Sequence, residues 1–103
     1  MNKILISCFL LAFIIACAGK EKKAPGEVSV AEGEHVYKKY CIICHGSDGK
    51  LGINGAKDIT VSKLTLEERE IQIKKGKNTM TPFEGVLTEE QIKSVALYSM
   101  NFK

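Results

Sequence analysis

Cys41-Ile42-Ile43-Cys44-His45 is the stretch from which the fold of this chain can be worked out. The pattern C-x-x-C-H is the attachment signature of a c-type haem. Two thiols separated by two residues can form thioether bonds to the two vinyl groups of one porphyrin. The histidine that follows then lies beneath the iron and supplies a proximal nitrogen ligand. The sequence therefore predicts one covalently bound haem c, attached to Cys41 and Cys44 and ligated by His45.

Two other uses of a C-x-x-C pair remain open at this point, a thioredoxin-like redox pair and half of a zinc site. The redox interpretation requires a βαβ pattern around the pair, and no segment of the sequence alternates with the period of a strand. The zinc interpretation requires a fourth ligand. The only other histidine is His35, and no second cysteine pair follows.

The first 16 residues have the layout of a secretory signal. Lys3 gives a positively charged start, and residues 4–16 are apolar except for Ser7. This run is shorter than the about 20 residues of a membrane span, although an uncleaved anchor is one alternative. Ile14-Ile15-Ala16-Cys17 resembles the lipobox of bacterial lipoproteins, which implies cleavage before Cys17 and a lipid on that cysteine. An ordinary signal peptide with an incidental Cys17 is the other alternative.

The next stretch, residues 17–28, has no apolar periodicity and contains Pro25 and Gly26, which predicts a flexible tether. The expected organisation is a lipoprotein signal peptide over 1–16, the tether over 17–28 and a folded domain over 29–103. Cleavage would remove Lys3 from a chain with 15 basic and 12 acidic side chains. That near-balance argues against nucleic-acid binding. Because bacteria attach c-type haem outside the cytoplasm, we expect an exported protein, lipid-anchored on the periplasmic side of a membrane.

Three pairs of the capping-box form S/T-x-x-E/Q indicate where helices begin: Ser29 with Glu32, Thr65 with Glu68, and Thr88 with Gln91. Apolar residues at helical spacing then predict helices over about 30–44, 66–75 and 89–102. The expected fold class is all-α, a small domain of about three main helices packed around one haem. The glycine-rich stretch over 46–60 predicts a loop with little order of its own. A domain of roughly 75 residues often requires a cofactor or crosslink, and a haem attached at two cysteines supplies both.

The expected sixth ligand of the iron is Met80, which lies in a loop between the second and third predicted helices. Met100 falls near the end of the third predicted helix. A thioether is a soft, neutral ligand that favours ferrous iron and raises the reduction potential relative to a second histidine. Two axial ligands leave no open position for oxygen or peroxide, which favours electron transfer over catalysis. The weaker alternatives for this position are His35, expected at the surface, and two lysines beside the loop, Lys75 and Lys77.

Taken together, residues from about 31 to 102 resemble class I cytochrome c of the small, single-haem bacterial type. In that family a glycine and an aromatic residue lie eight and four positions before the first haem cysteine. They pack against an aromatic residue near the end of the chain, and here Gly33, Tyr37 and Tyr98 occupy these places. The family's methionine loop matches Met80-Thr81-Pro82-Phe83. The resemblance implies the cytochrome c fold and an axial pair formed by His45 and Met80.

The sequence departs from the family pattern in two places. Thr81 separates Met80 from the proline, which many members have directly after the methionine. Larger members also orient the proximal histidine with a proline carbonyl in the loop after the haem signature, but this chain has only Pro25 and Pro82. We therefore expect another carbonyl, from residues 54–59, to bind the ring of His45, because such contacts tune a bound metal.

The expected function is electron transfer by a membrane-tethered carrier, a monomer that exchanges single electrons with a redox donor and an acceptor protein and is not an enzyme. One alternative is a haem-bearing subunit of a larger membrane oxidoreductase complex. The other is a haem peroxidase, which would need an open iron and polar distal groups, and His35 lies in the wrong segment for that role. A structural zinc module, which would lose its fold with a chelator, is the remaining interpretation.

Overall fold

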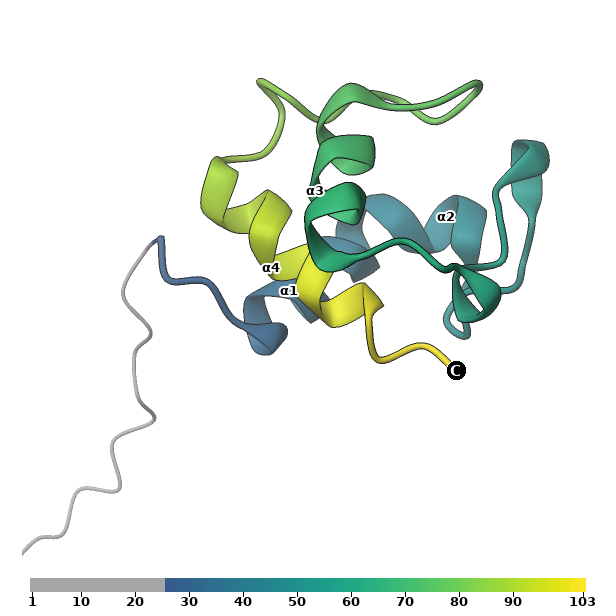
Figure 1. The fold of residues 1–103 in the computed structure, drawn as a ribbon, viewed down its shortest axis with the longest axis horizontal. Coiled ribbons are helices and arrows are strands. Elements are labelled where there is room, and N and C mark those ends of the chain that lie inside the picture. The colour runs from purple at the N-terminus through teal and green to yellow at the C-terminus, as the bar shows by residue number, and fades with distance from the viewer. Residues whose placement is uncertain (1–25) are drawn as a thin grey trace, which may run out of the picture.

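The computed structural model describes residues 26–103. The expected signal peptide, Cys17 and most of the expected tether lie outside the described residues. Residues 26–103 form helices, loops and two isolated bridges, without a β-strand, so the all-α prediction is confirmed (Figure 1). Within this part of the chain, no helix has the length and apolar character needed to cross a membrane.

The first helical segment changes its hydrogen bonding halfway along. Helix α1, Val30–Val36, continues through a π-helical turn, Tyr37–Cys41, into the short helix α2, Ile42–His45. The predicted helical extent of about 30–44 is confirmed to within one residue. The π turn inside it, which bonds residues five apart and takes up one extra residue, was not predicted. Ser29 caps α1 by accepting a hydrogen bond from the amide of Glu32 at 3.1 Å, which is one half of the expected capping box.

Helices α3, Leu66–Lys75, and α4, Glu89–Ser99, each begin with a complete capping box, as the sequence predicts. The bounds predicted for α3 are confirmed. Helix α4 ends three residues earlier than predicted, because the amides of residues 100–102 bond to carbonyls three residues back and tighten the chain into turns. These turns bring Phe102 against Tyr37, with ring centroids 4.9 Å apart.

Helix α1 crosses α4 (Figure 1), and Gly33 lies where the two helices meet. A Cβ atom at this position would run into the carbonyl oxygen of Ser94 and lie 2.7 Å from the Cβ of Tyr98. The hydroxyl of Ser94 also accepts a hydrogen bond from the amide of Ser29 at 3.0 Å. The crossing is therefore possible because glycine has no side chain, and the packing role expected for Gly33 is confirmed.

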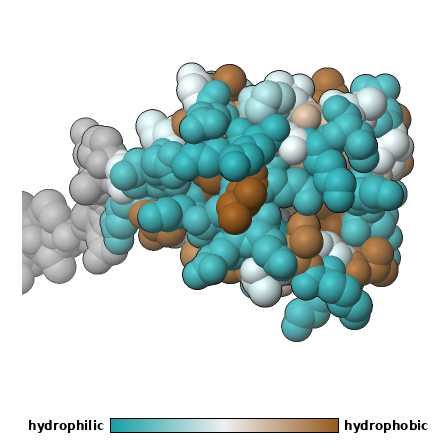
Figure 2. All heavy atoms as spheres, turned by 45° about the horizontal axis from the view of Figure 1, so that its top comes forward, coloured by the Kyte–Doolittle hydropathy of each residue, from teal (hydrophilic) through white to brown (hydrophobic). Residues whose placement is uncertain are grey.

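The buried core is small and lies around this crossing. It consists of Val36, Tyr37, Leu87, Ile92 and Val95, with Tyr98 packed at its edge, 5.3 Å from Tyr37 between ring centroids. The face of the domain shown in Figure 2 is mainly hydrophilic, with apolar residues in separate patches. Ile43, between the two cysteines, is 72% exposed, so the C-x-x-C stretch reaches the surface of the domain.

Candidate functional site

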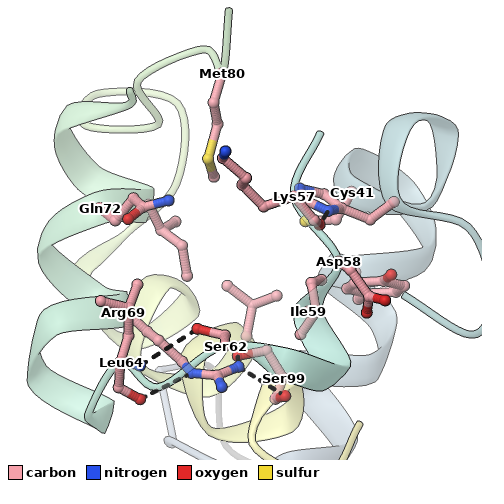
Figure 3. A pocket seen from close by; sticks show the side chains of 14 residues that line it. Cys41, Lys57, Asp58, Ile59, Ser62, Leu64, Arg69, Gln72, Met80 and Ser99 are labelled. Atoms are coloured by element: carbon pink, nitrogen blue, oxygen red, sulfur yellow. Dashed lines mark hydrogen bonds between the residues drawn. The ribbon is translucent and has the colours of Figure 1, made fainter. Parts of the chain in front are cut away.

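An open cavity of about 590 Å³, a volume that includes open solvent, lies between the first helical segment, helices α3 and α4, and the loops on either side of α3. Cys41 and His45 line it from the first helical segment, and Met80 lines it from the loop after α3. Figure 3 shows Met80 entering from one end and Cys41 from the side. Five apolar or aromatic residues complete much of its wall: Tyr37, Ile59, Leu64, Ile73 and Val95. A mainly apolar wall with a few polar groups is typical of a cofactor site.

The two cysteines of the signature lie on consecutive turns of the first helical segment. Both are free thiols with half-buried side chains, and Cys41 is the one that lines the cavity. Burial, followed by the charge of Cys44, raises the pKa of Cys41 to about 12. A redox-active or zinc-binding cysteine requires the thiolate, and its pKa is commonly lowered to about 3.5–7.5. In addition, residues 26–103 contain no group of three metal-ligating side chains. The raised pKa of Cys41 disfavours the reactive-dithiol interpretation.

A carbonyl from the glycine-rich loop orients the ring of His45. Its Nδ1 lies 3.1 Å from the carbonyl oxygen of Lys57. Because a carbonyl can only accept a hydrogen bond, Nδ1 donates the proton, and Nε2 is left as the nitrogen that can bind a metal. The prediction that the acceptor lies within residues 54–59 is confirmed.

The start of the glycine-rich loop is fastened to the helical segment that precedes it. The hydroxyl of Tyr37 donates a hydrogen bond to the carbonyl oxygen of Gly46 at 2.5 Å. Burial raises the pKa of Tyr37 to about 12, so the hydroxyl stays protonated and remains a donor. The amide of Leu51 donates to the carbonyl of His45 at 3.0 Å. These two bonds therefore fix the backbone of His45 and of the residue that follows it.

The loop that carries Met80 is shaped by Gly76. This glycine has a φ of 69°, and a Cβ there would run into the carbonyl of Met80 and lie 2.9 Å from the nitrogen of Pro82. The chain can therefore fold back tightly after α3. The hydroxyl of Thr79 then donates to the carbonyl of Asn54 at 2.6 Å, which joins the methionine loop to the glycine-rich loop.

The alternative ligands lie elsewhere. His35 is exposed on α1, and Met100 is 41% exposed at the end of α4; neither lines the cavity. Two polar residues of the wall, Arg69 and Gln72, were not predicted as site residues from the sequence. They stand three positions apart on α3, so their helical spacing was a signal that they share one face.

The donor set of the cavity fits a haem c. The free thiols of Cys41 and Cys44 can form the two thioethers, and an imidazole nitrogen and a soft thioether sulfur are neutral ligands suited to haem iron. The apolar wall suits a porphyrin plate. Of the four predicted site residues, the structure brings Cys41, His45 and Met80 to this one cavity, and Cys44 does not line it.

Comparison with known proteins also finds haem-binding cytochromes. The family described as "Cytochrome C oxidase, cbb3-type, subunit III" matches residues 28–98. Cytochrome c6 of Leptolyngbya boryana is 38% identical over 77 residues, which cover 69% of this chain and 89% of that protein. Cytochrome c6 of Synechococcus elongatus is 32% identical over 80 residues, covering 70% and 88%.

Solved structures show the same similarity. Cytochrome c6 from the diatom Phaeodactylum tricornutum has a TM-score of 0.62 at 30% identity, covering 70% of this chain and 91% of that one. The "KustC0563 c-type cytochrome" has a TM-score of 0.61 at 31% identity, covering 69% and 96%. Sequence, fold and cavity therefore agree: the chain belongs to the cytochrome c family as a small mono-haem cytochrome c, an electron carrier with one covalently attached haem c.

Proposed function

We propose that Cys41 and Cys44 hold the haem through two thioethers and that His45 and Met80 are its axial ligands. The observation that carries this proposal is the convergence of Cys41, His45 and Met80 on one cavity, with the His45 ring already oriented by Lys57. In this arrangement the protein passes single electrons from a donor protein to an acceptor protein.

The haem supplies a one-electron iron couple when it is bound, and the chain determines how that couple behaves. The carbonyl of Lys57 keeps Nε2 of His45 available and makes it a better donor. The thioether of Met80 favours the ferrous state. The bond between Thr79 and Asn54 connects the backbone on the two sides of the cavity. This bond holds the loop that carries Met80 against the glycine-rich loop that carries Lys57.

Potentiometric titration of the purified, haem-loaded protein tests this function. We expect a single reversible one-electron transition in the visible spectrum and no turnover of hydrogen peroxide, because both axial positions are filled by protein ligands. A high-spin ferric protein that consumes peroxide at enzymatic rates would contradict the carrier function and favour a peroxidase.

We also propose that the carrier is exported and tethered to the periplasmic side of a bacterial membrane by a lipid on Cys17, with residues 17–28 as the linker. The support is the sequence Ile14-Ile15-Ala16-Cys17 at the end of an apolar run. A lipid anchor keeps a small carrier close to membrane-bound redox partners, and its linker sets the reach.

The anchor predicts that the full-length protein incorporates a fatty-acid label in a bacterial host and that Cys17→Ser abolishes this incorporation. Cys8→Ser is the matched control, because it removes the other cysteine of the N-terminal segment and should keep the full label. Labelling that survives Cys17→Ser, or wild-type protein without label, would contradict a lipid on Cys17.

A haem-bearing subunit of a larger oxidoreductase is the second candidate, and the matching family description names such a subunit. The cytochrome c6 relatives, which this chain covers over most of their length, favour the free carrier. Purification from the native membrane under mild detergent distinguishes the two. Stoichiometric recovery with other subunits would support the complex, and recovery of the protein alone would support the carrier.

A further inference from the structure

The one arginine of this chain is buried in the wall of the cavity. Arg69 lies on α3 and is 9% exposed. Figure 3 shows its guanidinium at the end of the pocket opposite Met80, between Leu64 and Ser99. Arginine is seldom buried this deeply without a partner, so the position requires an explanation.

The hydrogen bonds of Arg69 leave part of the guanidinium unused. Nε donates to the carbonyl of Leu64 at 3.3 Å, and Nη1 donates to the carbonyl and hydroxyl oxygens of Ser99 at 2.9 and 3.1 Å. A guanidinium has five N–H donors. Within residues 26–103, no hydrogen bond involves Nη2, so its two N–H groups remain for another acceptor.

The positive charge of Arg69 also lacks a counter-charge in the described part of the chain. The ion pairs of residues 26–103 join Lys38 to Glu34 and Lys74 to Glu89. The carboxylate on the cavity wall, Asp58, accepts instead from the amide and hydroxyl of Thr60. Burial lowers the pKa of Arg69, but a guanidinium stays charged in proteins. A buried charge is costly unless an anion compensates it.

We propose that Arg69 binds a propionate carboxylate of the haem through Nη2 and thereby raises the reduction potential of the carrier. This inference rests on the proposed function, because it places the haem in the cavity. A haem carries two carboxylates, and an N–H of a charged guanidinium donates a strong, charge-assisted hydrogen bond to a carboxylate. Leu64 and Ser99 hold the guanidinium in place at the cavity wall.

An ion pair between Arg69 and a propionate would raise the reduction potential of the haem. Ferric haem carries one more positive charge than ferrous haem, so an uncompensated propionate stabilises the ferric state. Removing the charge of Arg69 should therefore lower the equilibrium constant for haem reduction by roughly tenfold, which corresponds to about 59 mV for a one-electron couple.

The test compares reduction potentials of haem-loaded Arg69→Met, Arg69→Lys and Lys93→Met proteins with the wild type. We expect the equilibrium constant for haem reduction to fall roughly tenfold in Arg69→Met. In Arg69→Lys, which keeps the charge, it should fall by less than about threefold. Lys93 is exposed on α4, so Lys93→Met removes an equal charge that solvent already screens and should change little. A folded Arg69→Met protein with an unchanged potential and only a lower melting temperature would overturn the proposal.

A crystal structure of the haem-loaded wild type tests the same contact without any substitution, in case Arg69→Met does not fold. An Arg69 nitrogen within hydrogen-bond distance of a propionate oxygen is the expected result, and both propionates turned away from Arg69 would overturn it. Failure of the proposed function has a different signature, because the wild-type protein itself would then lack haem or show high-spin iron.

Discussion

Replacing both cysteines of the signature, Cys41→Ser with Cys44→Ser, is expected to abolish covalent haem binding and to unfold the domain. The buried core around α1 and α4 is small, and the cavity of about 590 Å³ would lose the apolar plate that completes its packing. Domains of this size have little stability to spare without a cofactor or crosslink. The measurements are covalent haem per chain, from denaturing gels stained for haem, and helical content from circular dichroism.

The single variant Cys44→Ser is the control, because it retains one thioether through Cys41. We expect it to keep haem and helical structure at reduced stability. A double variant that stays fully helical without haem would contradict the view that the cofactor is part of the core.

Substituting Gly33→Ala should destabilise the domain by about 2 kcal/mol, which corresponds to a melting temperature roughly 8–16 °C lower. Helix propensity alone predicts that Gly33→Ala stabilises the domain, because alanine is favoured over glycine in a helix interior by about 1 kcal/mol. The added Cβ meets the Ser94 carbonyl and lies 2.7 Å from the Tyr98 Cβ, so α1 and α4 must separate. Thermal unfolding of the haem-loaded protein measures the effect.

The reverse substitution two positions earlier, Ala31→Gly, is the matched control. Ala31 is exposed on the same helix, so only propensity acts there, and we expect a loss of about 1 kcal/mol. If Gly33→Ala instead raised the melting temperature, the close crossing of α1 and α4 would not be a constraint on this fold.

Features encoded over short stretches of sequence could be predicted well. The capping boxes at Thr65 and Thr88 fixed the starts of α3 and α4, because side chain and backbone satisfy each other within four residues. The acceptor for His45 could be confined to residues 54–59, and Lys57 supplies it. The packing role of Gly33 followed from its spacing before Cys41 and the family resemblance.

Features that depend on distant contacts could not be predicted. Apolar periodicity does not distinguish an α-helix from one with a π turn, so the change at Tyr37–Cys41 was missed. The early end of α4 at Ser99 depends on packing between Phe102 and Tyr37. The burial of Arg69 depends on acceptors 30 residues away in α4, and a charged residue in a polar helix is ordinarily read as a surface residue.

Absorption spectra of the oxidised and reduced wild-type protein and of Met80→Ala test the central claim, ligation of one haem c by His45 and Met80, most directly. We predict a sharp low-spin ferrous spectrum and a weak far-red iron–sulfur band in the ferric wild type. Met80→Ala should abolish that band, and Met100→Ala should retain it. A high-spin ferric spectrum that Met80→Ala leaves unchanged, or a protein without haem absorbance, would contradict the account.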